Sequence, residues 1–446
     1  MGRFFIGYAP AHNSGCFKHS LPGIGSIVFF ALFLVMHRFI RLLIILLPIA
    51  FLHGSLPAAV LHTGHGQRYA DVSGAAKAAR PGDTILLHSG TYSGNQSLQG
   101  LQGAPGKWIY IIAEKSGAVL FKGGAAAWTG SDLAYLHIEG IVFSGQTGNG
   151  LNIDDGSSYA SPAHHIVLQH CIFRDMAATG NNDLLKLSGV DDLTIQQCTF
   201  LNGSPGGSGI DMVGCHNSLI RQCRFENMGA NAVQMKGGSC NIRVEACIFI
   251  NAGSRAINLG GSTGQAFFRP GNATWEAADL KVYSNVFIGS EVPVAFVGCT
   301  RSEVVNNTIY KPGRWVIRIL QENKDTARFV KCGNNTFRNN LIYVDGQLRT
   351  TCSIGAGTAP ESFTFSNNLW FHSEDNAWQG PQLPVREKDG LTGKDPLFRN
   401  AGKEDFVIPL HSPAARAGYP MVHPEKDNAG NKFLPKRAIG AFEAAT

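Results

Sequence analysis

The sequence predicts an all-β solenoid, a fold in which short β-strands stack coil upon coil along one axis. Eight segments end alike, with small or polar residues, then Cys or Asn, one further residue and a large apolar residue. The Cys/Asn positions are separated by 27, 25, 24, 38, 22, 33 and 28 residues. A period near 25 is typical of stacked coils, because no single coil can bury its own apolar face. The eight positions are Cys171, Cys198, Cys223, Cys247, Asn285, Asn307, Asn340 and Asn368.

The composition fits a chain that turns often. Its 446 residues include 53 glycines, and only 16% of the residues are charged. The formal net charge of +6 overstates the basic character, because residues 1–58 hold four basic residues and no acid. The remaining 34 basic and 32 acidic residues give +2, and no basic cluster interleaves with aromatic side chains. We therefore expect no nucleic-acid partner.

Residues 1–58 are predicted to be an N-terminal extension followed by a signal peptide. Two apolar runs, Ile24–Met36 and Leu42–Leu52, are each shorter than the roughly 18 to 20 residues that span a bilayer. From Met36 onward the order is a basic start, an apolar centre and the small-residue run Ser55–Ala59, as in signal peptides. We expect translation to start at Met36, or the first 35 residues to be dispensable. The mature protein is then exported, to the periplasm, the medium or the cell surface.

The alternative for the same segment is an uncleaved anchor. In either case the membrane is contacted only through this N-terminal signal or anchor segment.

Residues 59–371 are predicted to form the solenoid, beginning with a short helix over Tyr69–Ala79. A helix there would cover the open first coil, whose strand edge is otherwise unpaired. Strands are expected at Thr84–His88, Lys107–Ala113 and Ala134–Phe143. From about residue 135, each coil shows two strands, one running into the Cys/Asn position and one some ten residues later.

Two long segments interrupt the coils, Gly261–Asp279 and Gln321–Asn334. Insertions in solenoids lie in loops, often on the binding face, so we expect both segments to form walls beside the coil surface. The Cys/Asn repeat stops after Trp370, and the Pro/Gly-rich residues 372–446 are predicted to form a C-terminal capping region.

The chain has ten cysteines, which in an exported protein invites a disulfide framework. Four of them share one repeat position, so we favour a ladder of buried thiols that asparagine amides continue. A disulfide between Cys332 and Cys352 is a further expectation.

Motifs at both ends of the chain resemble one superfamily. The matching elements are ARPGDTI and GTY near the start, the Cys/Asn repeat, and DPLF, SPA and IGAFE near the end. Over roughly residues 66–446 the chain resembles the pectin-lyase-like superfamily. The resemblance implies a single-stranded right-handed parallel β-helix with an N-terminal helical cap. It selects no function, because such proteins include polysaccharide lyases, glycoside hydrolases, epimerases and phage-type binding proteins.

The second strand of each coil places polar side chains on the outer surface. Alternation with period two points the apolar residues inward and the intervening residues outward. Neighbouring coils lie about 4.8 Å apart, so outward residues of successive coils are neighbours and form a polar patch. The first outward column is Asn152, Lys186, Asp211, Gln234, Asn258, Phe296 and Arg318, and the second is Asp154, Ser188, Val213, Lys236, Gly260, Gly298 and Leu320.

The residue types of this patch suit β-elimination on a uronic-acid-containing polysaccharide. A lyase removes the proton beside the uronate carboxylate and expels the 4-linked oxygen, which requires a base, a proton donor and neutralisation of the carboxylate. We predict that Lys236 is the base and that Lys186 and Arg255 lower its pKa. Asp211 is the fourth residue of the predicted catalytic group, as an ion-pair partner of Lys186.

Substrate-binding side chains are expected around this centre. Amides polarise the carboxylate, arginines bind further carboxylates along an acidic polysaccharide, and aromatic rings stack on sugar rings. The residues predicted for these roles are Gln234, Asn258, Arg269, Arg318, Phe268 and Trp275.

The patch also resembles the sites of β-helical alginate and chondroitin lyases, where a Lys and an Arg on successive coils do the chemistry. Lys236 in VQMKGG fits the Lys position, whereas Gly260 stands in place of Arg and Gln234 in place of an acidic calcium ligand. Calcium is an alternative cofactor, since it takes six to eight oxygen ligands and acidic residues beside a lysine resemble calcium-dependent pectate lyases. The candidate calcium ligands are Asp154, Asp155, Asp183 and Asp211.

Two other functions remain open from the sequence. A glycoside hydrolase needs two carboxylates roughly 5 to 10 Å apart. A non-catalytic β-helix that binds glycan or assembles at the cell surface needs neither a base nor a carboxylate pair.

Overall fold

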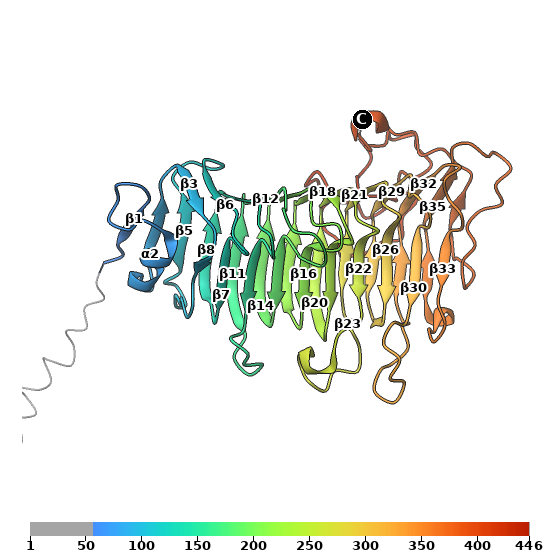
Figure 1. Cartoon of the computed structure of the whole chain (residues 1–446). Helices are drawn as coiled ribbons and strands as arrows, with labels where there is room; N and C mark the ends of the chain where they lie inside the picture. Colours follow the sequence, from blue (N-terminus) through green and yellow to red (C-terminus); the bar gives the residue numbers. More distant parts are fainter. Residues whose placement is uncertain (1–56, 446) are drawn as a thin grey trace, which may run out of the picture. The chain divides into compact units, whose positions relative to one another are not determined.

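The computed structural model describes residues 57–445. From Ala58 onward the chain forms one compact unit, built from three long sheets that run side by side along one axis (Figure 1). Neighbouring strands pair in parallel, so the expected parallel β-helix is confirmed. Among the described residues, no helix is long and apolar enough to cross a membrane. The predicted signal peptide or anchor lies almost wholly outside the described residues.

The three sheets hold 14, 12 and 10 strands and are named A, B and C. Sheet A contains β1 (Val60–Thr63), β2 (Thr84–Leu87), β5 (Ile109–Ala113), β8 (Ala134–Glu139), β11 (Ala163–Gln169), β14 (Val190–Gln196), β17 (His216–Arg221), β20 (Ser239–Glu245), β23 (Ala277–Ala278), β24 (Lys281–Tyr283), β27 (Cys299–Thr300), β28 (Glu303–Val305), β31 (Thr336–Arg338) and β34 (Thr364–Ser366). Sheet B contains β3 (Gly90–Ser93), β6 (Val119–Lys122), β9 (Ile141–Ser144), β12 (Ile172–Arg174), β15 (Thr199–Leu201), β18 (Arg224–Met228), β21 (Ile248–Ala252), β25 (Val286–Ile288), β29 (Thr308–Tyr310), β32 (Leu341–Val344), β35 (Leu369–His372) and β36 (Leu391–Thr392). Sheet C contains β4 (Gln96–Ser97), β7 (Trp128–Ser131), β10 (Leu151–Asp154), β13 (Leu185–Ser188), β16 (Ser208–Val213), β19 (Asn231–Lys236), β22 (Arg255–Gly260), β26 (Val292–Val297), β30 (Ile317–Leu320) and β33 (Cys352–Ile354).

The N-terminal end is covered by the helix α2 (Val72–Ala78), which confirms the expected helical cap. The helix is shorter than predicted because the Asp71 side chain accepts a hydrogen bond from Gly74 N at 2.8 Å and so caps its first turn. Its buried face packs against β1, β2 and β4. Three 3₁₀ turns lie elsewhere, namely η1 (Gln265–Phe267), η2 (Pro360–Ser362) and η3 (Ala401–Lys403).

Each coil passes through three strands, rather than the two expected from the sequence. The residue before the Cys/Asn position adopts a left-handed backbone, with φ of 51° at His170, 54° at Gln197 and 53° at Gln222. This bend ends the sheet A strand and begins the sheet B strand, so the predicted single strand is divided at a corner. Hydrogen bonds to the next coil hold the bend, such as Gln197 N to Arg221 O at 3.1 Å.

The Cys/Asn positions form a continuous buried ladder along this corner. The four repeat thiols are buried, and the phenylalanine rings that follow them are stacked. Asn307 accepts a hydrogen bond from Asn285 N at 2.9 Å and donates to Asn340 Oδ1 at 2.9 Å. Side-chain amides thus take over the ladder where the thiols end, as the repeat predicted.

The expected disulfide between Cys332 and Cys352 is wrong, since both cysteines are free. Cys352 lies on β33 of sheet C, whereas Cys332 is buried against Cys299 of sheet A. The two thiols therefore belong to different walls of the solenoid.

The C-terminal residues pack against the outside of the β-helix. Ile408, Ala414 and Ile439 pack against Leu341 and Leu369 on the outside of sheet B. Nearer the N-terminal end of sheet B, Glu404 of this segment forms an ion pair of 3.1 Å with Arg224 of β18. The segment therefore folds back along the flank of the β-helix, as the red trace of Figure 1 shows.

Replacing Asn307 with Ala tests the ladder. We expect the free energy of unfolding to fall by about 1–3 kcal/mol or more, because a buried donor such as Asn285 N loses its acceptor. The matched control is Cys198→Ala at the same repeat position, which removes a small apolar side chain and should cost on the order of 1 kcal/mol. Thermal or denaturant unfolding measures both variants, and equal losses would contradict an amide-specific role.

Candidate active site on sheet C

Four consecutive strands of sheet C bring the predicted polar side chains together. Lys186 on β13, Asp211 on β16, Gln234 on β19 and Asn258 on β22 are paired directly across neighbouring strands. The next outward position follows the same register, because Val213 on β16 pairs with Lys236 on β19. The central expectation, that residues some two dozen apart are neighbours, is therefore confirmed for this patch.

The predicted outward columns are wrong at β26, where they are shifted by one residue. Ala295, and not Phe296, pairs with Asn258, and Val297 takes the expected place of Gly298. Phe296 is fully buried in the core. The strand reads VPVAFV and is buried at every position, so apolar–polar alternation gives no register there.

Asp211 is the centre of an ion-pair network with two lysines. Lys186 Nζ donates a hydrogen bond to Asp211 Oδ2 and lies 3.7 Å from Asp183 Oδ2. Lys236 Nζ lies 3.2 Å from Asp211 Oδ1 and 3.2 Å from Gln234 Oε1. Both aspartates are 3% exposed, whereas the side chains of Lys186 and Lys236 are 24% and 17% exposed. The carboxylates are thus buried beneath the ammonium groups.

Burial and charge act in opposite directions in this network. Burial lowers the pKa of Lys186, but the charges of Asp211 and Asp183 and the hydrogen bond to Asp211 raise it above its usual value overall. For Asp183, burial and the charge of Asp211 raise the pKa to about 6. Lys186 therefore stays protonated at neutral pH, whereas the Asp183 carboxyl, with its pKa of about 6, titrates close to neutral pH.

Arg255 and Asn258 do not take their predicted roles toward Lys236 and the substrate. Arg255 Nη2 donates to Glu322 Oε1 at 2.8 Å, and its Nη1 donates to Asn258 Oδ1 at 3.4 Å. Asn258 is 1% exposed and its amide donates to Gly260 O at 3.3 Å. Asn258 is a support for Arg255, and the charge of Arg255 is neutralised by Glu322 rather than presented to Lys236.

Comparisons with known proteins agree with this geometry at the level of the fold. The family model described as the right handed beta helix region matches residues 114–273. The crystal structure of pectate lyase Pel9A superimposes with a TM-score of 0.55 at 15% identity, covering 88% of this chain and 98% of that one. The chain has a right-handed parallel β-helix fold.

Two further structures are similar to this β-helix. The complex of XylC with xylose has a TM-score of 0.50 at 10% identity, and covers 87% of this chain and 98% of that one. Alginate lyase from Paenibacillus sp. str. FPU-7 has a TM-score of 0.43 at 15% identity, and covers 75% of this chain and 99% of that one. No curated protein sequence matches the chain. At such identities the likeness describes the fold, and function has to be argued from the site.

Arg269 anchors its loop instead of facing the patch. Its guanidinium donates two hydrogen bonds of 2.6 Å to the carboxylate of Asp191 on β14, and a third of 2.9 Å to Gly214 O. Burial raises the pKa of Asp191, but hydrogen bonds from Arg269 and His216 lower it overall to about 2. The prediction that Arg269 binds substrate is therefore wrong, because its donors are used within the protein.

The aromatic residues of the same loop are also engaged internally. Phe268 is fully buried and packs against Phe329 with ring centroids 5.2 Å apart, which joins the two predicted walls to each other. Trp275 lies beneath the guanidinium of Arg301, 5.0 Å from the ring centroid. Neither ring is placed as predicted for stacking on a sugar in the patch; the exposed aromatic of this loop is Phe267, at 63%.

Glu276 is a residue that supports the site from below and that sequence reasoning missed. It is fully buried, and its carboxylate accepts hydrogen bonds from Gly237 N at 3.0 Å, Thr263 N at 2.9 Å and Asn323 Nδ2 at 3.3 Å. It thereby ties the residue after Lys236 to both loops. The sequence offered little signal, since Glu276 is one of two acids in the run WEAADL.

The four aspartates proposed as calcium ligands do not form one site. Asp183 and Asp211 face Lys186, while Asp154 and Asp155 accept hydrogen bonds from the turn amides Gly156 N at 3.0 Å and Ser157 N at 3.1 Å. Among residues 57–445, no group of three or more His, Cys, Asp or Glu side chains is arranged to hold a metal ion.

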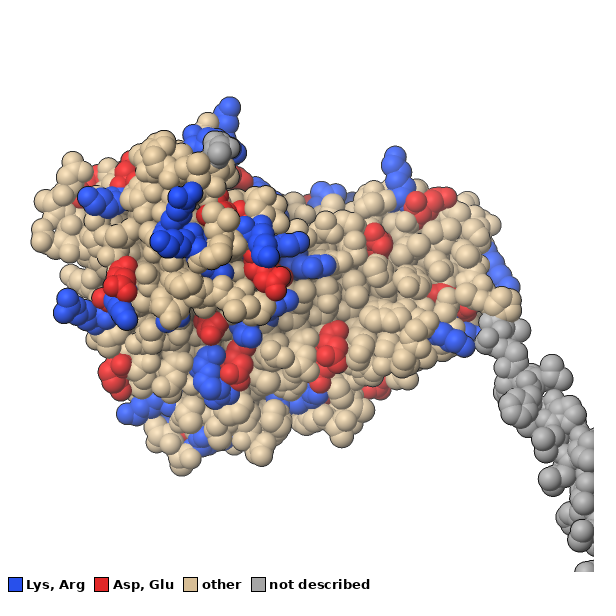
Figure 2. Space-filling model, turned by 180° about the vertical axis from the view of Figure 1, so that it is seen from behind, with Lys and Arg blue, Asp and Glu red and all other residues tan. Residues whose placement is uncertain are grey.

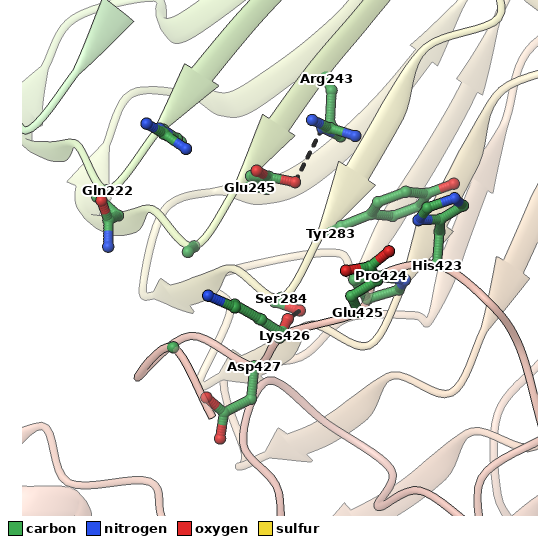
Figure 3. A pocket seen from close by; sticks show the side chains of 13 residues that line it. Gln222, Arg243, Glu245, Tyr283, Ser284, His423, Pro424, Glu425, Lys426 and Asp427 are labelled. Atoms are coloured by element: carbon green, nitrogen blue, oxygen red, sulfur yellow. Dashed lines mark hydrogen bonds and ion pairs between the residues drawn. The ribbon is translucent and has the colours of Figure 1, made fainter. Parts of the chain in front are cut away.

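A separate hollow lies on sheet A, away from these four strands of sheet C. It has a volume of about 400 Å³ and is bounded by sheet A residues and by the returning C-terminal segment. Figure 3 shows Arg243 paired with Glu245 on one side and His423, Glu425 and Lys426 on the other. Positive and negative side chains also alternate over the face seen in Figure 2, without a field of one sign.

Removing the Glu276 carboxylate should loosen both loops. In Glu276→Ala we expect amide hydrogen exchange at Gly237 and Thr263 to accelerate about tenfold or more, because buried donors lose a charged acceptor. The matched control is Glu322→Gln, since Glu322 is 34% exposed and pairs only with Arg255 in the described part of the chain. Exchange followed by mass spectrometry checks this, and unchanged protection in Glu276→Ala would contradict it.

The raised pKa of Asp183 predicts a stability change with pH. The native state binds the Asp183 proton more tightly than the unfolded chain, whose pKa is 3.8, so this group's stabilisation is present below pH 3.8 and is lost as pH rises through about 6. The effect amounts to about 3 kcal/mol at most. Asp183→Asn keeps the acceptor for Ser208 N but cannot titrate. The free energy of unfolding of both proteins is measured between pH 4 and pH 7. That of the native protein should fall relative to that of Asp183→Asn as the pH rises. A constant difference between the two would refute the shift.

Proposed function

We propose that this β-helix is an exported polysaccharide lyase that cleaves a uronic-acid-containing polysaccharide by β-elimination. The observation that carries the proposal is the network in which the partly exposed side chains of Lys186 and Lys236 both pair with the buried Asp211. Such a surface favours an anionic ligand. The pectate lyase Pel9A shares the fold over 88% of the chain, which is compatible with this reaction.

In the proposed reaction, Lys186 neutralises the substrate carboxylate. Its raised pKa keeps it protonated at neutral pH. A fixed positive charge beside the carboxylate stabilises the negative charge that develops when the neighbouring C–H bond breaks. The side chain of Lys186 is 24% exposed, so a ligand can contact it.

Lys236 is the proposed base. In its uncharged form it accepts the proton from the carbon beside the carboxylate. A carbon–carbon double bond forms, the bond to the 4-linked oxygen breaks, and that oxygen takes a proton from solvent water as it leaves. Asp211 Oδ1 and Gln234 Oε1, each 3.2 Å from Lys236 Nζ, hold the resulting ammonium.

Two other activities compete with this proposal. A glycoside hydrolase fits less well, because Asp183 and Asp211 are buried and both face Lys186 instead of an open cleft. A non-catalytic glycan-binding protein is favoured by one observation, namely that both lysines are already paired with Asp211 inside the protein. Export is part of the proposal and rests on the signal-peptide order of residues 36–59.

A substrate panel separates these functions. Purified protein is incubated with alginate, pectate, chondroitin and hyaluronan, and we expect ultraviolet absorbance from an unsaturated product with at least one of them. Lys236→Ala should lower the rate about 100-fold or more, because general base catalysis typically contributes that much. Lys281→Ala, on β24 of sheet A, is the matched control and should leave the rate unchanged.

The outcomes distinguish the alternatives. Reducing ends without ultraviolet absorbance would indicate a hydrolase, and binding without either product would indicate a glycan-binding protein. Full activity of Lys236→Ala would show that another residue is the base.

A further inference from the structure

A second group of cationic side chains continues sheet C beyond the candidate site. Arg318 on β30 pairs with Ala295 on β26, which pairs with Asn258 on β22. With strands about 4.8 Å apart, the Arg318 backbone lies about 10 Å from that of Asn258 and about 19 Å from that of Asp211. Arg318 therefore stands on the same outer face, farther along the axis of the β-helix.

The charge of Arg318 has no partner among residues 57–445. Of its neighbours, Arg255 is paired with Glu322 at 2.8 Å and Arg314 with Glu291 at 2.8 Å. Arg318 forms no ion pair or hydrogen bond within the described chain, and its Nε is buried without an acceptor. Three guanidinium groups thus share two carboxylates, and the unmatched one is half-buried.

The guanidinium of Arg318 is held in place although it lacks an acid. It lies 4.8 Å from the ring centroid of Trp315, and the guanidinium of Arg314 lies 3.9 Å from the same centroid. Stacking on an indole restrains the plane of a guanidinium while leaving its N–H edge available. Burial and the like charge of Arg255 lower the pKa of Arg318, which indicates that an added negative charge here would be stabilised.

We propose that Arg318 binds a carboxylate of the polysaccharide several sugar units away from the bond that is cleaved. The inference rests on the proposed function, since it identifies the ligand as a chain of consecutive uronates. A guanidinium fork matches a carboxylate with two parallel hydrogen bonds, so a neutral or esterified sugar at this position would lose them. Arg318 is in this sense a specificity-determining residue.

Direct binding, measured apart from cleavage, tests the inference. Oligomers of galacturonate, of mannuronate and guluronate, and of glucuronate are titrated by calorimetry, each beside its methyl ester. We expect at least one acid oligomer to bind, and Arg318→Gln to weaken its binding about tenfold or more. The affinity of the methyl ester should change little in this variant, and the effect should decrease with added salt.

Two variants serve as controls. Arg314→Gln removes a guanidinium from the same Trp315 ring, but one already neutralised by Glu291, so its effect should be several-fold smaller. Glu322→Gln releases Arg255 from its ion pair and should strengthen binding of the acid oligomer. Trp315 fluorescence gives a second signal from the same place.

The results separate this inference from the proposed function. Acid oligomers that bind without forming an unsaturated product would reject the lyase but leave the Arg318 subsite in place. Equal loss of acid and ester binding in Arg318→Gln, no loss at all, or no preference of the native protein for acids would overturn the subsite.

Discussion

The in-register stacking of successive coils is the constraint on which the rest of this structure depends. Parallel hydrogen bonding satisfies the backbone of each strand with the coil before and after it, so a residue's neighbour across the sheet is found one repeat away in sequence. The amide ladder through Asn307 and Asn340 ties the coil corners in the same register. A slip of one residue would turn the whole outward face of a strand into the core.

This register explains why a buried acid is tolerated on an outer face. Asp211 stands between strands that carry Lys186 and Lys236, so both of its oxygens meet a cation. A buried carboxylate is costly unless it is paired, and the two neighbouring coils provide the pairing. The consequence for function is a surface that presents positive charge while its compensating negative charge lies below, which suits recognition of an anionic polymer.

In the loops, charged and aromatic side chains that could bind a ligand instead make contacts within the protein. Arg269, Phe268 and Glu276 fasten the long segment after β22 to sheet A, to the neighbouring loop and to the residue after Lys236. Their chemistry would also suit a substrate, but each is buried against an internal partner. Arg318, on a strand rather than a loop, has no hydrogen-bond or ion-pair partner among residues 57–445 and so has donors available for a ligand.

The sequence by itself determined the stacked architecture, the Cys/Asn ladder and the patch from Lys186 to Asn258, because these depend on local periodicity repeated in each coil. It failed at β26, where an entirely apolar run carries no alternation to set the register. Only the tertiary structure decided the partners of Arg255, Asn258 and Arg269, since these contacts join residues of loops and distant coils that no periodicity relates. The corner bend at the repeat position likewise required the next coil, because hydrogen bonds between coils hold a backbone conformation that the residue itself does not favour.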